Sequence, residues 1–190
     1  MTFDPLPPGW QDLPARDRLL HTAHALFYRD GIRATGVDRL IAESGVAKLT
    51  FYRHFPSKDD LVRAFLDYRH ERWMAWFVDA LGRHGAAAPH AGLAPVAAAM
   101  AEWFATPQFR GCAFINSVAE VGGTLPDATA VSLRHKQDMV DVIASLLPAG
   151  SASRARAEAA ALAVDGAIVR AQMGDAASAL AGLQRLLTAL

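Results

Sequence analysis

The stretch from Thr35 to Lys58, TGVDRLIAESGVAKLTFYRHFPSK, constrains the fold of this chain more than any other. Gly45 stands between two short apolar-polar segments, and glycine can take the left-handed backbone conformation that ends one helix and turns the chain into another. We therefore expect a helix capped by Thr35 and ending at Gly45, then a second helix from about Lys48 to Phe55. Two short helices joined by a tight turn are typical of a helix-turn-helix.

The second of these helices carries side chains that suit a DNA groove. At 100° per residue, Phe51 and Phe55 share one face and are expected to be buried. The opposite face presents an aliphatic, a hydroxyl, an aromatic and a basic side chain: Leu49, Thr50, Tyr52 and Arg53. Such groups can contact thymine methyls, base edges and phosphates. Three further candidates lie at the two ends of the segment: Lys48, His54 and Lys58. The alternative is a small three-helix bundle whose surface carries these polar residues by chance.

The bulk composition favours a packed helical protein. The 190 residues are 52% hydrophobic, with no run long enough to cross a bilayer and no signal-peptide pattern at the start. A single cysteine excludes an intrachain disulfide and fits a reducing cytoplasm, so we expect a cytoplasmic protein without a membrane partner. Residues 15–72 hold 11 Lys and Arg against 8 Asp and Glu, a net +3 that leaves −3 for the remainder. A DNA-binding head on a body that does not touch DNA fits this distribution.

The residues before the motif form an arm and one helix. Prolines and a glycine mark residues 1–13 as an arm, and a helix should begin near Pro14 and end at Gly31. His21 and His24 are three residues apart on this helix, a spacing that can share a metal ion. No third ligand is indicated nearby, so we interpret them as partly exposed surface histidines and predict no metal and no cofactor.

The segment GVAKLTFYRHFPSKDDLV resembles the signature of the tetracycline-repressor (TetR) family of one-component bacterial regulators. The likeness covers roughly residues 15 to 65 and implies a three-helix DNA-binding domain, a helical ligand-binding domain and a homodimer. It implies that Thr50 contacts a base or phosphate, and that four other side chains contact phosphates: Thr35, Tyr52, His54 and Lys58. Three positions depart from the family pattern and leave individual contacts open: Gly36, Ala47 and Leu49.

A long helix should follow the motif. Pro56 and Ser57 begin it, and about 27 residues to Arg83 would give about 40 Å of helix. An element of this length can belong to both halves of the molecule, so a ligand that moves its far end would also move the DNA-reading helix. The helix carries three aromatics that are either core or the wall of an effector pocket: Trp73, Trp76 and Phe77.

The remaining chain reads as further amphipathic helices. Candidate effector contacts on their apolar faces are Met100, Trp103, Phe104, Cys112, Asn116, His135 and Met139. An inward histidine is more often a satisfied core group than a ligand contact, and a redox role for Cys112 finds no support in its sequence neighbours. The last two helices, about 153–173 and 176–190, are rich in small residues. They either complete the monomer core or form a four-helix dimer interface, and the family likeness favours the interface.

The sequence thus predicts an all-α protein with an arm over residues 1–13, a helix-turn-helix domain over 14–56 and an effector-binding and dimerisation domain over 57–190. The predicted function is that of a DNA-binding repressor, released from a near-palindromic double-stranded operator by a small, largely apolar effector. An activator or a regulator that responds to a protein partner remains an alternative. An enzyme is the remote one, because the chain offers no paired carboxylates, nucleophile elbow, glycine-rich phosphate loop or metal-ligand spacing.

Overall fold

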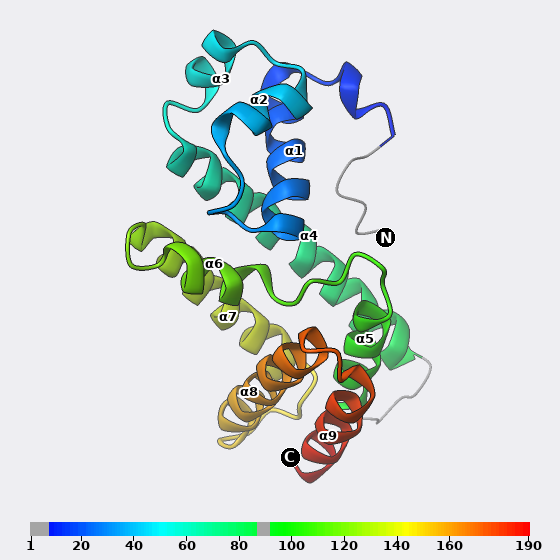
Figure 1. Ribbon diagram of the computed structural model, residues 1–190. Helices are drawn as coiled ribbons and strands as arrows, with labels where there is room; N and C mark the ends of the chain where they lie inside the picture. The colour runs from blue at the N-terminus through cyan, green and yellow to red at the C-terminus, as the bar shows by residue number, and fades with distance from the viewer. Residues whose placement is uncertain (1–7, 87–91) are drawn as a thin grey trace. The chain divides into compact units, whose positions relative to one another are not determined.

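The computed structural model describes residues 8–86 and 92–190, which form one short 3-10 helix and nine α-helices (Figure 1). Their bounds are η1 Trp10–Asp12, α1 Ala15–Asp30, α2 Val37–Ser44, α3 Lys48–His54, α4 Lys58–Ala86, α5 Ala94–Phe104, α6 Ala113–Val121, α7 Pro126–Ala144, α8 Ser153–Gln172 and α9 Ala176–Ala189. No strand occurs within the described ranges, which confirms the all-α class. No helix in those ranges combines the length and the apolar run that a membrane crossing requires.

The turn between α2 and α3 forms as predicted. Gly45 has φ 63° and ψ 27°, the left-handed conformation expected at this position. Its N–H donates to the carbonyl of Ala42, and the N–H of Val46 donates to Ile41, so two carbonyls at the end of α2 are satisfied. Val46 is buried beneath the turn. These bonds fix the direction in which α3 leaves the turn.

The prediction that Thr35 caps α2 is wrong. The helix begins at Val37, and its N-cap is Gly36, which makes no side-chain cap hydrogen bond. Thr35 is instead fully buried, and its hydroxyl donates to the carbonyl oxygen of Gly31 at 2.8 Å. This hydrogen bond closes the loop between α1 and α2. It also gives the carbonyl group that follows α1 a hydrogen-bond partner.

The described chain packs into two compact units. Of the described residues, 8–71 and 113–132 make up the first unit, and 72–86, 92–112 and 133–190 make up the second. Helices α4 and α7 each supply residues to both units. The predicted boundary between residues 56 and 57 separates a DNA-binding domain from an effector-binding domain. It is defined by function and not by packing, so it stays a prediction.

The first unit has an apolar core under α3. Helices α1, α2 and α3 contact one another (Figure 1), and Leu19, Leu40 and Phe51 are fully buried among them. The core also encloses a cation: Arg69 is 2% exposed, its guanidinium lies 4.0 Å from the Tyr28 ring, and it bonds His24 Nε2 at 3.2 Å. These contacts hold α4 firmly against α1.

The predicted surface position of His24 is therefore wrong, because this side chain is 2% exposed. Its ring meets Arg69, whereas Nδ1 of His21, one turn earlier, lies 3.2 Å from the Tyr68 hydroxyl. The two histidines thus serve two different packing contacts between α1 and α4. Only His21 keeps the partial exposure expected from the sequence.

Candidate functional site

Helix α3 is anchored by its aromatic side and open on the other. Phe51 is fully buried and Phe55 is 3% exposed, while the guanidinium of Arg16 lies 5.4 Å from the Phe55 ring. On the opposite side, Leu49 is 73% exposed and Tyr52 is 43% exposed. The predicted division of the helix into a buried and an outward face is therefore confirmed.

The polar members of the predicted set gather on the same short helix. Lys48, Arg53 and His54 are exposed, and Thr50 is half-buried. Lys48 Nζ lies 3.7 Å from a carboxylate oxygen of Asp38 on α2, an ion pair open to water. Exposed pairs of this kind contribute little, so Lys48 can exchange this partner for another anion at small cost. The face thus offers apolar, hydroxyl and cationic groups side by side.

Lys58 and Thr35 are placed differently. Nζ of Lys58 donates to the carbonyl oxygen of Ile32 at 2.5 Å, in the loop between α1 and α2. Burial lowers the pKa of Lys58, while the charges of Asp59 and Glu120 oppose this change. The hydroxyl of Thr35 is likewise committed, to Gly31. The hydroxyl of Thr35 has one proton and would have to leave Gly31 before donating to a phosphate, whereas Lys58 has two further N–H donors and can bond a phosphate while keeping Ile32.

The loop between α1 and α2 has another partner, which the sequence did not indicate. A carboxylate oxygen of Glu120, on α6, accepts the backbone N–H of Arg33 at 2.9 Å. A Cβ added to Gly31, whose φ is 93°, would lie 3.0 Å from the same side chain. Glu120 is 87 positions from Arg33, so no local pattern links them. Within the first unit, this carboxylate and Lys58 together hold the loop that leads into the helix-turn-helix.

Most of the predicted effector contacts lie in one aromatic cluster of the second unit. Trp73 is its centre: its ring stacks on Phe77 at 4.8 Å and meets Trp103 edge-on at 5.6 Å. The His135 ring lies 4.9 Å from Trp73. The other members of the predicted set within this unit are also buried: Trp76, Met100, Phe104, Cys112 and Met139. The structure brings nine of the ten predicted residues into the second unit, whereas Asn116 belongs to the first.

One buried polar atom of the cluster has no partner in the part of the chain that the structure describes. Trp73 Nε1 is buried and makes no hydrogen bond, although the side chain is only 3% exposed. A buried donor left unsatisfied costs on the order of 1–3 kcal/mol. A ligand with a hydrogen-bond acceptor could remove this cost by entering between the rings, so Trp73 is the strongest candidate among the predicted effector contacts, which stay a prediction.

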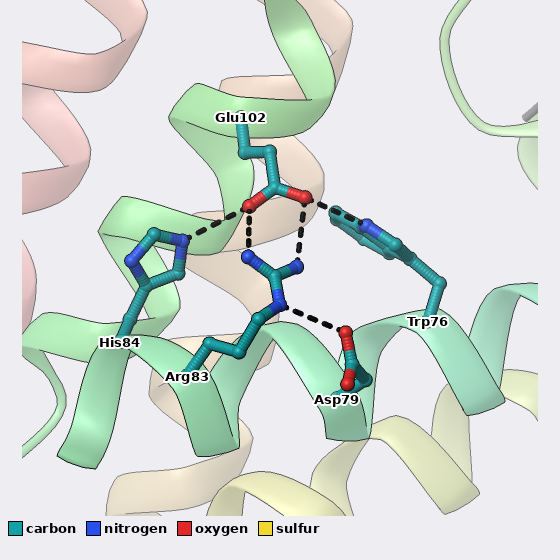
Figure 2. Close-up of polar contacts among 5 residues, drawn as sticks. All are labelled: Trp76, Asp79, Arg83, His84 and Glu102. Carbon is teal, nitrogen blue, oxygen red and sulfur yellow. Dashed lines mark hydrogen bonds and ion pairs between the residues drawn. The ribbon is translucent and has the colours of Figure 1, made fainter. Parts of the chain in front are cut away.

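One edge of the aromatic cluster is held by a polar network (Figure 2). The Glu102 carboxylate, on α5, accepts two hydrogen bonds from Arg83 at 2.9 Å and one from Trp76 Nε1 at 3.1 Å. His84 Nε2 lies 3.1 Å from the same carboxylate, and Arg83 also bonds Asp79. The bond from Arg83, with smaller contributions from Trp76 and His84, holds the pKa of Glu102 at about 2, although burial opposes the shift. The network fixes the end of α4 to α5.

Cys112 also has a neighbour that the sequence did not indicate. Its Sγ lies 3.5 Å from Nζ of Lys136, and Nζ also donates to Asp165 at 2.5 Å. Burial lowers the pKa of Lys136, but the effects of Cys112 and Asp165 outweigh it and raise the pKa overall. The lysine is 24 positions from the cysteine, too far for a sequence pattern to pair them.

Comparison with known proteins places the first part of the chain beside one class of protein. A family model described as bacterial regulatory proteins of the tetR family matches residues 19–65. The chain is 38% identical over 55 residues to an uncharacterized HTH-type transcriptional regulator, YxaF, of Bacillus subtilis (strain 168). That match covers 28% of this chain and 29% of YxaF, under a third of the relative's length.

Two solved structures cover nearly the whole chain. SCO4454, a TetR-family transcriptional regulator from Streptomyces coelicolor, is 33% identical with a TM-score of 0.80, covering 92% of this chain and 89% of that one. A cysteine mutant of the TetR-family regulator CifR, solved with 26-bp double-strand operator DNA, is 21% identical with a TM-score of 0.74. It covers 92% of this chain and 96% of its own, and its likeness to this chain concerns the fold.

Proposed function

Because the chain belongs to the TetR family of bacterial transcriptional regulators, we propose that it acts as a repressor that a small, largely apolar effector releases from DNA. In this proposal a homodimer places two copies of α3 in the major grooves of a near-palindromic operator in the cytoplasm. One observation carries the DNA contact: α3 exposes Leu49 and Tyr52 on one side while Phe51 on the other side is fully buried. The two exposed side chains are three residues apart on one short helix, so they form a small apolar surface beside cationic groups, which suits a binding face.

The side chains of α3 divide between reading and positioning. Thr50 is half-buried at the edge of the exposed face, where its hydroxyl can bond a base edge. Leu49 suits a thymine methyl, and Tyr52 with Arg53 suits phosphates. The operator complex of CifR, which shares the fold, supports this use of the helix-turn-helix. Lys48, His54 and Lys58 complete the proposed phosphate contacts, with Thr35 contributing only after its hydroxyl leaves Gly31.

An apolar stripe on α8 supports the proposed dimer. Leu162 is 74% exposed and Met173 is 78% exposed, and both lie on one face of the helix. The residues at helical spacing along this face are small or apolar and are exposed or half-buried: Ala155, Ala159, Leu162, Gly166, Val169 and Met173. The opposite face of α8 is buried against α9 and α5. A second copy of the same stripe would cover it, as an isologous interface requires.

The effector response is proposed for the aromatic cluster around Trp73. Its unpartnered Nε1 gives a ligand a hydrogen-bond donor, and the surrounding rings give it apolar contact. Trp73, Trp76 and Phe77 lie on α4, the helix whose first residues also belong to the unit that contains α3. A ligand that displaces these rings would therefore act on a helix shared by both units. The affinity for DNA would change only if the ligand-bound and ligand-free conformations bind DNA with different free energies.

Selection from random double-stranded DNA tests the proposal. The purified chain should enrich a near-palindrome whose half-sites lie about one helical turn or a multiple of it apart. A reporter placed behind that sequence should be repressed by the gene and derepressed by the effector. Failure to enrich any duplex would reject the proposed DNA binding. Enrichment of a duplex together with activation of the reporter would reject the proposed repression and keep the DNA binding.

A further inference from the structure

A cavity of about 550 Å³ lies in the second unit. It is bounded by the first turns of α5, the first turn of α8 and the last turns of α9, three helices that contact one another (Figure 1). Small-molecule sites usually have volumes of about 300–1,000 Å³. The cavity has the size of a ligand site and shares no residue with the predicted effector contacts.

The lining divides into an apolar wall and one cation. Leu93 and Ala97 of α5, Leu187 of α9 and Leu190 provide the wall, and Leu190, the last residue of the sequence, also has a main-chain carboxylate. Gln184 and Thr188 add an amide and a hydroxyl from α9. Arg156 is the only charged side chain among the lining residues in the described part of the chain.

Among the described residues, Nε of Arg156 has no hydrogen-bond partner. This atom is buried, and the side chain makes no ion pair within residues 8–86 and 92–190. Arg154, two residues earlier, shows the contrast, because it bonds Glu158 at 3.0 Å and also Asp141. A partly buried cation with an unmet donor is stabilised by an anion, and a guanidinium matches a carboxylate with two parallel hydrogen bonds.

We propose that this cavity binds a monocarboxylate with an apolar chain. The carboxylate accepts hydrogen bonds from Arg156 and from the Gln184 amide. The chain lies along Leu93, Ala97 and Leu187, where its burial from water contributes affinity. The thiol, the aromatic cluster and the α3 face take no part, so this site does not depend on the proposed DNA function.

Calorimetric titration of the full chain with sodium octanoate tests the site. Octanoate should bind with saturation at one site per chain. Acetate lacks the apolar chain and octyltrimethylammonium reverses the charge, so neither should compete. Competition by octyltrimethylammonium as strong as that by octanoate itself would show that the carboxylate is not recognised and would overturn the proposal.

Two substitutions locate the binding. Arg156→Gln should weaken octanoate binding at least tenfold, about the value of a hydrogen bond to a charged group. Arg154→Gln, the matched control on the same turn of α8, should change it less than about twofold because its exposed ion pairs lie outside the cavity. Equal losses in the two variants would indicate general charge attraction and reject the site.

A third variant tests the cavity independently of charge. Ala98 is half-buried and lines the cavity from α5, so Ala98→Phe should fill the space and abolish octanoate binding. Circular dichroism and the melting temperature establish that each variant is folded. Should Ala98→Phe fail to fold, Thr188→Trp blocks the cavity from α9. Undiminished binding in a folded cavity-filling variant would overturn the proposal.

Discussion

The ammonium nitrogen of Lys58 lies 2.5 Å from the carbonyl oxygen of Ile32, so the cation assigned to a DNA phosphate is held by the protein's own loop. Glu120 binds the same loop through the N–H of Arg33. A phosphate that binds Lys58 therefore shares the ammonium group with this carbonyl, because one N–H bonds Ile32 and two others remain for an anion. The loop that leads into the helix-turn-helix is thus coupled to the side chain expected to reach DNA.

Replacing Lys58 by alanine tests its role at the phosphate. One lost phosphate contact should weaken operator binding and reduce the slope of log affinity against log salt by about 0.9. Fluorescence anisotropy over a salt series measures both quantities, and Arg154→Gln in the body serves as the control for a lost positive charge. An unchanged slope in the Lys58 variant would remove this residue from the DNA contacts.

Leu49 and Phe51 separate DNA binding from folding on one short helix. Leu49→Ala should change the free energy of unfolding by less than about 0.5 kcal/mol, because Leu49 is 73% exposed. It should still weaken binding to the preferred operator by removing an apolar base contact. Phe51→Ala should cost about 3–5 kcal/mol of stability because Phe51 is fully buried. Urea unfolding with operator titration distinguishes them, and full operator affinity in Leu49→Ala would exclude the contact.

Leu162 tests the proposed dimer face. Leu162→Lys places a charge in the middle of the α8 stripe and should give a monomer by size-exclusion chromatography with light scattering. Operator affinity should then fall by about 10²-fold or more, because the two DNA-binding domains are no longer joined in one molecule. Leu133→Lys, on α7 and 59% exposed, is the matched control and should remain dimeric. A dimeric Leu162→Lys would place the interface elsewhere.

Glu102 should make the stability of the second unit depend on pH. Its pKa is about 2 in the folded chain against 4.5 ordinarily, so its ion pairs stabilise the fold above pH 4.5 and lose this effect as the pH falls toward 2. Glu102→Gln should cost about 1–2 kcal/mol at pH 7 and make the decline in stability below pH 4.5 less steep. Chemical unfolding between pH 7 and pH 3 measures this.

Glu158→Gln provides the comparison for that titration. Glu158 pairs with Arg154 on the exposed surface of α8, where the interaction is screened by water. Its replacement should leave both the stability and its pH profile nearly unchanged. Identical stability profiles for the two variants would show that the Glu102 network contributes no more to stability than an exposed ion pair does.

Local periodicity made the helix-turn-helix predictable. The positions of Phe51 and Phe55 on one face, and of Gly45 at the turn, follow from residues within one or two helical turns. The prediction for Thr35 failed for a physical reason. A threonine before a helix can either cap that helix or donate its hydroxyl to a carbonyl earlier in the chain. The buried Thr35 donates to the carbonyl of Gly31. The boundary of α2 therefore lay beyond what propensity could determine.

The contacts that the sequence did not reveal all join distant positions. Glu120 meets Arg33 across 87 positions, and Lys136 meets Cys112 across 24. Arg156 looks like any solvated residue at the start of a helix, and only packing shows that its Nε is buried without a partner. Amphipathic faces predicted which side chains are buried, but not which of them meet, since that depends on how the helices cross.

The most direct test of the central claim is the affinity of the purified chain for its selected operator, compared with that of the Leu49→Ala, Thr50→Ala and Tyr52→Ala triple variant. Anisotropy titrations at one salt concentration should show tight, sequence-specific binding of one dimer by the parent chain. The triple variant, with unchanged circular dichroism, should bind the operator no better than an unrelated duplex. Equal, sequence-specific affinity in the two proteins would contradict the assignment of α3 as the DNA-reading helix.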